Sequence, residues 1–333
     1  MKKSLLALAV LGAFAGVASA QSSVTIYGLL DLAVTKGNGG TAPADSNPGG
    51  NGLSRAYIMK QSASSRLGFR GTEDMGGGLS AQFQIEHRFT PDDGAAANPF
   101  WAGRSYVQIT SAAVGSIYMG REYTPAFWPA VKTDPFGWDG VGQVATAQYA
   151  RFRSASSAVR TANTGGFKSR SFGGVTVQAA VALGEGNTVG RDIGFNVEYA
   201  GGPIYAGFGY EKINDGPAIQ ADNQMINFGG AYDLGFVRPA IYFAQAKTGV
   251  NGVDKNKSAM FALTAPIGAG KLKFAYNRLD PQGTSNNETH IGVGYDYALS
   301  KRTNLYVDYG QGKSQVAGLT VNRAAAVGMK HTF

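Results

Sequence analysis

The sequence predicts an all-β fold, a sixteen-stranded antiparallel β-barrel that spans a membrane. Three observations predict it. Apolar and polar residues alternate with a period of two from end to end, the alternating segments number sixteen, and short turns alternate with long polar loops. A strand with one apolar and one wet face produces such alternation, and an even number of strands brings both ends of a closed barrel to the same side.

The first twenty residues have the features of an export signal. Two lysines precede an apolar run that ends at Ala18, and Ala18-Ser19-Ala20 provides a small-x-small cleavage site. The run is too short to be a membrane-spanning helix, and polar residues follow it at once. We therefore expect a signal peptide over residues 1–20, cleaved near Ala20 during export through the periplasm, and a single β-barrel domain over residues 21–333.

Composition narrows the classes of function. The chain has no cysteine, which removes disulfides and thiol chemistry, and its 48 glycines, 16 tyrosines and 18 phenylalanines suggest tight strand pairing and aromatic belts. The signal holds two of the 30 basic residues and none of the 22 acidic ones, so the remainder has a net charge of 28 − 22 = +6. This excess is too diffuse for a nucleic-acid partner, and in a pore it would favour anions.

The strands follow from the alternation in chain order. In one clear case the apolar residues Phe83 and Ile85 alternate with the polar residues Gln82, Gln84 and Glu86. A transmembrane strand needs only ~9–11 residues of such a pattern. The sixteen expected strands are 23–35, 53–72, 79–90, 100–111, 116–121, 157–169, 175–182, 191–200, 204–213, 223–234, 236–246, 257–265, 271–279, 289–300, 303–310 and 323–333.

The connections between these strands alternate strictly between two lengths. Short turns such as 201–203 and 301–302 would face the periplasm, and long polar loops such as 36–52 and 311–322 would face the exterior. The third long connection, from Glu122 to about Ser156, is anomalous because it runs through three prolines without alternation. A loop of this length in a compact barrel is usually functional.

A secreted β-sandwich is the soluble alternative, since alternation alone does not tell which face is buried. The C-terminus argues against it. Ala325, Val327 and Met329 lead in steps of two to the terminal Phe333. An aromatic residue that ends the chain on the exposed face of a strand suits a lipid interface better than a soluble sheet edge.

Five segments resemble a known family. They are Ser23 to Gly28, the hairpin from Ser65 to Ala81, Met119 to Pro125, Tyr295 to Leu305 and Val327 to Phe333. Together they resemble the Gram-negative general porin family, most closely its neisserial and β-proteobacterial branch. The resemblance extends over the whole of the chain that follows the signal.

The resemblance implies a homotrimeric sixteen-stranded barrel in the outer membrane, with the third extracellular loop folded into the lumen as a constriction. It implies outer-membrane lipid and lipopolysaccharide as neighbours, and insertion by the barrel-assembly machinery with Phe333 as the assembly aromatic. The expected function is passive diffusion of ions and small hydrophilic solutes through a water-filled pore. No cofactor, metal or catalytic residue is expected.

Alternation also orients the arginines. If Leu67 faces lipid, Arg66 and Arg70 face the lumen, and the same argument turns Arg104 inward. By resemblance, Arg66, Arg104 and Arg160 form the basic side of the constriction, although the strand that carries Arg160 departs from the family pattern. Each arginine could instead pair with a neighbouring carboxylate as scaffolding of the wall.

The acidic side of the constriction is expected on the third loop, at Glu122, Asp134 and Asp139. Each of these could instead cap a turn or hydrogen-bond to the wall. Facing rows of arginine and carboxylate would place a transverse field across the pore. Further positive charges on this loop are Lys132, Arg151 and Arg153. This excess of positive charge predicts a mild preference for anions.

Other functions remain open at this point. A substrate-specific channel for sugars, phosphate or small organic anions would show saturable block by one solute, and the extracellular loops could serve as a receptor or adhesin. An outer-membrane enzyme needs a nucleophile or activated water with a positioned base. The three histidines His87, His290 and His331 have no Ser/Asp constellation nearby in the sequence, so we expect no enzyme.

Overall fold

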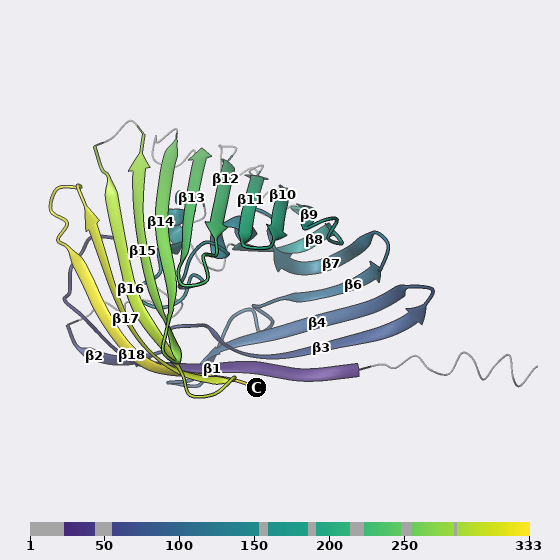
Figure 1. The fold of residues 1–333 in the computed structure, drawn as a ribbon, viewed down its shortest axis with the longest axis horizontal. Helices are drawn as coiled ribbons and strands as arrows, with labels where there is room; N and C mark the ends of the chain where they lie inside the picture. The colour runs from purple at the N-terminus through teal and green to yellow at the C-terminus, as the bar shows by residue number, and fades with distance from the viewer. Residues whose placement is uncertain are drawn as a thin grey trace, which may run out of the picture.

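The computed structural model describes residues 23–43, 55–152, 159–185, 191–213, 223–247, 255–282 and 285–333. Its strands curl round into a closed wall in which the first strand lies beside the last (Figure 1). The expected signal peptide lies outside the described residues. No helix in the part of the chain that the structure describes is long and apolar enough to cross a bilayer.

The wall consists of β-strands that follow one another along the chain. Their bounds are β1 (Ser23–Gly37), β2 (Tyr57–Lys60), β3 (Ser65–Gly76), β4 (Leu79–Thr90), β5 (Ala95–Ala96), β6 (Ser105–Ser111), β7 (Gly115–Tyr123), β8 (Arg160–Ser169), β9 (Val175–Ala182), β10 (Asp192–Gly201), β11 (Ile204–Ile213), β12 (Asn223–Tyr232), β13 (Arg238–Lys247), β14 (Asn256–Ile267), β15 (Gly270–Pro281), β16 (Glu288–Ala298), β17 (Thr303–Ser314) and β18 (Asn322–Thr332). Two short helices, α2 (Phe127–Val131) and α3 (Ala145–Gln148), lie between β7 and β8.

In the described residues, these eighteen segments make sixteen barrel strands. β2 and β3 pair with β1 one after the other along its length, and β5 and β6 pair with β4 in the same way. Neighbouring strands are antiparallel, and β1 closes the barrel on β18 from the pair Leu29 and Thr332 to the pair Gly37 and Ala324. The expected sixteen-stranded antiparallel barrel is confirmed.

The strand expected over residues 53–72 is interrupted because side chains compete for its backbone hydrogen bonds. The chain leaves the sheet between β2 and β3. There the backbone N–H of Ser62 donates to Asp31 Oδ1 at 2.9 Å, and that of Ser65 donates to Gln61 Oε1 at 2.6 Å. Alternation in the sequence does not reveal this competition, because Asp31 lies on a different strand.

The two faces of the wall differ as a membrane barrel requires. On β10, Phe195 and Val197 face outward and are each 40% exposed, whereas Asn196 and Glu198 face inward and are 0% and 3% exposed. In a soluble β-sandwich the apolar side chains would be the buried ones. The barrel therefore presents an apolar surface around a polar interior, which excludes the sandwich.

The chain between β7 and β8 lies against the inner face of the barrel. Helix α2 contacts β10, β11 and β12, and α3 contacts β13, β14 and β15. The main buried apolar cluster is at this contact, where Phe127, Val144 and Tyr149 of the loop meet wall residues such as Tyr242 and Met260. The core of the molecule is therefore the interface between one loop and half of the barrel.

Candidate functional site

Asparagines on the inner face of the wall hold the loop, residues 124–159. The Nδ2 of Asn196 on β10 donates to Pro125 O at 2.8 Å, and the Nδ2 of Asn227 on β12 donates to Ala126 O at 2.7 Å. A third bond of the same kind joins Asn256 on β14 to the loop. Each bond satisfies a carbonyl that the barrel removes from solvent. The path of the loop is thus set by strands far away in the sequence.

Glycines on the inner face make room for the same loop. A Cβ atom added at Gly292 on β16 would lie 1.9 Å from Gly142 O, and one added at Gly310 on β17 would lie 1.7 Å from Val141 O. Such distances are impossible for any other residue unless the backbone moves. Part of the high glycine content therefore serves the contact between loop and wall, besides the strand pairing that composition suggested.

Wall carboxylates neutralise the loop cations. Lys132 Nζ donates to both carboxylate oxygens of Glu198 on β10 at 2.9 Å, and Arg151 pairs with Glu288 on β16. These contacts place two of the expected loop cations on the side where the loop meets the wall. The third, Arg153, lies outside the described residues.

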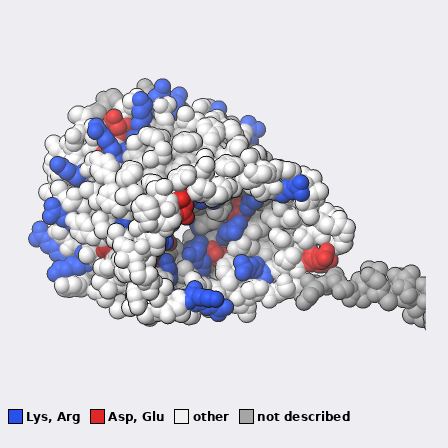
Figure 2. Space-filling view, viewed as in Figure 1, with Lys and Arg blue, Asp and Glu red and all other residues white. Residues whose placement is uncertain are grey.

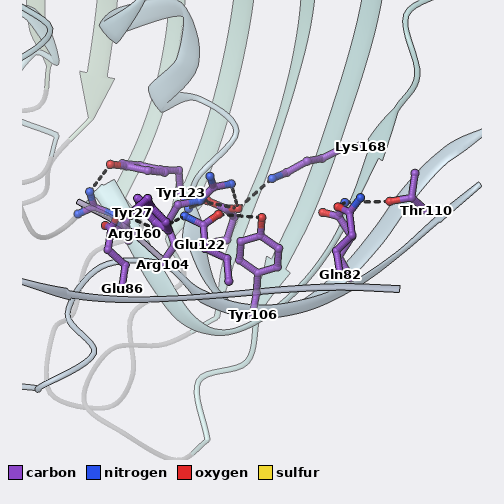
Figure 3. Close-up of polar contacts among 12 residues, drawn as sticks. Tyr27, Gln82, Glu86, Arg104, Tyr106, Thr110, Glu122, Tyr123, Arg160 and Lys168 are labelled. Atoms are coloured by element: carbon purple, nitrogen blue, oxygen red, sulfur yellow. Dashed lines mark hydrogen bonds and ion pairs between the residues drawn. The ribbon is translucent and has the colours of Figure 1, made fainter. Parts of the chain in front are cut away.

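Arg104, Glu122 and Lys168 form an ion-pair cluster on the wall (Figure 3). Arg104 Nε donates to Glu122 Oε1 at 2.9 Å and to Oε2 at 3.1 Å, and Lys168 Nζ on β8 lies 2.9 Å from Glu122 Oε2. The sequence predicts Glu122 on the loop, opposite the arginines, but its side chain lies beside Arg104. The reason is that β7 continues to pair with β8 through a bulge at Gly120 and so extends to Tyr123.

Three arginines converge on a cavity of about 440 Å³ between the wall and the loop. They are Arg66 on β3, Arg88 on β4 and Arg160 at the start of β8. Arg88 pairs with Glu86 at 2.7 Å, and the Arg160 guanidinium lies 4.0 Å from the centre of the Tyr123 ring. Within the described ranges, Arg66 forms no ion pair. This cavity is the candidate constriction.

The two other carboxylates expected on the loop, Asp134 and Asp139, behave differently. Asp134 caps its own turn, because its carboxylate accepts the backbone N–H groups of Phe136 at 3.0 Å and Trp138 at 2.9 Å. Asp139 instead lines the arginine cavity. Burial raises the pKa of each carboxyl to about 6, although the charge of Arg66 lowers the pKa of Asp139 in part. Among the described loop residues, Asp139 is the one acidic group that lines the cavity.

The loop side of the cavity is largely apolar. It is lined by Phe127, Trp128, Val131 and Trp138. Of the expected row of carboxylates, only Asp139 faces the arginines among the described residues. Glu122 is on the wall and Asp134 caps its own turn, and aromatic rings line most of the loop side. The remaining field across this cavity comes mainly from the arginines.

A second cavity, of about 360 Å³, shares Gly137 and Asp139 with the first but has charges of both signs. There Lys273 Nζ lies 2.8 Å from Asp296 Oδ1 and 3.1 Å from Asp308 Oδ1. Basic and acidic side chains are both visible inside the hollow of the molecule (Figure 2). The lining of this second cavity holds five aspartates and three lysines, so a preference for anions has to arise at the arginine cavity.

Arg88 and Lys168 are not among the site residues that the sequence predicts. Arg88 lies two residues after Glu86 on the polar face of β4, so the alternation already identified in that strand could have found it. Lys168 lies in the segment described as departing from the family pattern. Arg70, which is predicted to face the lumen, does not line the arginine cavity. It is exposed, and its guanidinium carbon lies 5.2 Å from the centre of the Tyr27 ring.

The three histidines have structural contacts. His87 stacks on Phe100 with ring centres 3.8 Å apart, and His331 Nδ1 lies 2.8 Å from Thr303 Oγ1. His290 Nε2 lies 3.4 Å from a carboxylate oxygen of Glu288. Over the described ranges, no group of three acidic, histidine or cysteine residues could hold a metal ion.

Comparisons with known proteins agree with this architecture. The chain matches the family model described as Gram-negative porin over residues 7–316. Outer membrane porin protein 32 of Delftia acidovorans is 35% identical over 319 residues, which cover 92% of this chain and 88% of that protein. Major outer membrane protein P.IB of Neisseria meningitidis serogroup A is 26% identical over 357 residues, with 100% of both chains covered.

A solved structure shows the same fold. An anion-selective porin from Comamonas acidovorans superposes with a TM-score of 0.80 at 27% identity, covering 94% of this chain and 100% of that one. The relatives are channels of the outer membrane, so the rival interpretation as an enzyme is excluded. The closed barrel, the inward loop and the family match lead to one conclusion: this chain belongs to the Gram-negative porin family and is a channel of the outer membrane.

Proposed function

We propose that this porin passes ions and small hydrophilic solutes by passive diffusion and prefers anions at the constriction between Arg66, Arg88 and Arg160 and the loop. One observation carries the proposal: the three arginines face a loop surface on which Asp139 is the one described carboxylate. Selectivity in a pore follows from its narrow section and the charges that line it. Three cations opposite a surface with one carboxylate leave an excess of positive charge, which raises the local concentration of anions.

The surrounding ion pairs support this proposal. Glu122 forms ion pairs with Arg104 and Lys168, and Glu86 forms one with Arg88 at 2.7 Å. Arg66 forms no ion pair within the described residues. Positive charge is thus left over at the arginine cavity. The Comamonas acidovorans neighbour is itself described as anion-selective.

A reversal-potential measurement tests the preference. The purified protein is reconstituted in a planar bilayer under a KCl gradient, and we expect the potential to show that chloride is more permeant than potassium. The variant Arg66→Gln should move the permeability ratio toward unity, because it removes a cation that forms no ion pair among the described residues. Lys301→Gln, in an exposed short turn, removes the same charge elsewhere and should leave the ratio unchanged. Preference of the wild type for potassium would refute the proposal.

A channel specific for phosphate or small organic anions is the second candidate, since three arginines around one cavity suit an oxyanion. General diffusion predicts that the current falls in proportion to the fraction of chloride that is replaced by a larger anion. A specific channel predicts saturable block by one anion at low concentration. A titration with inorganic phosphate at constant ionic strength separates the two.

We infer that the mature protein begins near Gln21 and assembles as a homotrimer in contact with lipopolysaccharide. Strongly exposed apolar side chains on β1, β7 and β18 support a subunit interface there: Val24, Ile26, Met119 and Val327 are 67%, 60%, 69% and 63% exposed. N-terminal sequencing tests the cleavage, and cross-linking in detergent tests the trimer. Recovery of the monomer alone after cross-linking would contradict the trimer.

We also propose that Phe333 is the aromatic residue read by the barrel-assembly machinery. Its backbone pairs with Gly28, with the N–H of Gly28 3.0 Å from Phe333 O, and its side chain is 43% exposed. A terminal aromatic in this position is available before the barrel closes. Deleting Phe333 should lower the amount of inserted protein while leaving the conductance of the inserted channels unchanged.

A further inference from the structure

The cavity at the constriction has two chemically different sides. Arg66, Arg88 and Arg160 form one, and the loop forms the other with aromatic and aliphatic side chains. An apolar surface in a pore neither binds an ion nor replaces its hydration, so the loop side of the cavity does not contribute to the binding of a simple ion. The apolar side therefore calls for a ligand with an apolar part.

The aromatic side is a packed unit. The rings of Tyr123 and Phe127 are stacked with centres 4.5 Å apart, Trp128 lies 5.3 Å from Tyr123, and Phe127 meets Trp138 edge to face at 5.0 Å. Packing of this kind locks the rotamers of the outer rings. Trp128 and Val131 are only half-buried, so they offer the accessible apolar surface of the cavity.

The cationic side is held in place by the same unit. The Arg160 guanidinium lies 4.0 Å from the centre of the Tyr123 ring and also donates a hydrogen bond to the Tyr123 hydroxyl. Stacking fixes the plane of a guanidinium and reduces the entropy lost when it binds a carboxylate. Arg66 forms no ion pair among the described residues, and it is thus the cation most available to a ligand.

We propose that this cavity binds small carboxylates that carry an apolar or aromatic body. The carboxylate lies among Arg66, Arg88 and Arg160, and the body lies against Trp128 and Val131. The cavity volume of about 440 Å³ is within the ~300–1,000 Å³ of small-molecule sites. This inference rests on the proposed anion preference and adds a solute class to it.

Block of chloride current by two carboxylates tests the site. Benzoate and acetate have the same charged group, and benzoate alone carries a ring. In the reconstituted wild-type channel, benzoate should lower the chloride conductance saturably at concentrations where acetate acts only as a poorly permeant anion. Trp128→Ala should raise the half-blocking concentration of benzoate by about 2- to 10-fold, as expected for the loss of one aromatic contact, and should not alter the effect of acetate.

Two further variants complete the design. Trp128→Phe keeps a ring and should restore most of the benzoate block. Trp101→Ala removes an exposed tryptophan that does not line the cavity, so benzoate should block this variant at the same concentrations as the wild type. The reversal potential of each variant is measured as well, and a chloride preference equal to that of the wild type shows that its arginines are still in place.

The outcomes distinguish this inference from the proposed function. If the wild type prefers potassium, the anion preference itself fails. If the wild type prefers chloride but benzoate and acetate act alike, the preference stands and the carboxylate site is refuted. Equal benzoate block in the wild type and in Trp128→Ala, with chloride preference retained, would also refute the site as placed here.

Discussion

The two halves of the inner wall perform different tasks. The half from β3 to β8 faces the cavity and carries Arg66, Arg88 and Arg160. The half from β10 to β17 carries amides, carboxylates and glycines that contact the loop, such as Asn227 and Gly310. Both halves have the same alternating sequence pattern. They differ in whether an inward side chain meets water or a second layer of protein.

This difference explains why the cavity beside the first half has a mainly cationic lining although the barrel contains many carboxylates. On the second half, Glu198 and Glu288 are used to pair with loop cations. On the first half, Glu122 pairs with Arg104 and Lys168. A charge that is paired and buried contributes little to the field in the water beside it. The field in the cavity therefore comes mainly from its arginines, of which Arg66 forms no ion pair among the described residues.

The largest effect is expected where the loop touches the second half of the wall. A methyl group at Gly310 would lie 1.7 Å from Val141 O, so Gly310→Ala should push the loop away from β17. We expect a loss of stability of about 1–3 kcal/mol or more and a higher single-channel conductance with weaker selectivity. Conductance and heat-induced unfolding in detergent measure both.

Gly230→Ala is the matched control for that change, since a Cβ there has no neighbour closer than 3.6 Å. It should leave stability and conductance close to those of the wild type. Normal conductance in Gly310→Ala would mean that the contact between loop and wall is not what narrows the pore.

A smaller effect is expected from the hydrogen bonds that hold the loop. Asn227→Ala removes the donor to Ala126 O and leaves that carbonyl buried without it, which should cost about 1–3 kcal/mol. The expected readout is a lower unfolding temperature together with noisier open-channel current. Asn304→Ala, on β17 and with no hydrogen bond to the described part of the loop, should change neither. Identical traces for the two variants would show that the loop does not depend on this bond.

The smallest effect concerns the charge of Asp139 opposite the first half of the wall. Burial raises the pKa of this carboxyl to about 6, with Arg66, Lys330, Asp31 and Arg88 as its charged neighbours. Below pH 6 the carboxyl is increasingly neutral, so the chloride preference should rise between pH 7.5 and pH 5. The change should stay below about twofold because salt screens a single charge in a wet pore.

Asp139→Asn should show the raised preference at both pH values, since it has no charge to lose. A wild-type chloride preference that falls on acidification, or a pH response that persists in Asp139→Asn, would assign the response to another group.

Much of the fold could be predicted from the sequence, and less of the site. Alternation correctly turned Arg66 inward and placed the lipid-facing side chains of β10 outward. It did not show that β7 runs on to Tyr123, and so it left Glu122 on the wrong side of the pore. It also did not show that Asp134 would cap its own turn, because a carboxylate in a loop has the same sequence signature whether it faces water or a backbone N–H.

By itself, the sequence determined the number of barrel strands, their antiparallel order and, where a strand is regular, the inward or outward direction of its side chains. These are local properties, since the pleat of a strand turns each residue opposite to its neighbour. Only the tertiary structure decided where the loop lies and which charges remain unpaired. Those outcomes depend on contacts such as that between Asn227 and Ala126, which are 101 positions apart, and no local pattern records such a distance.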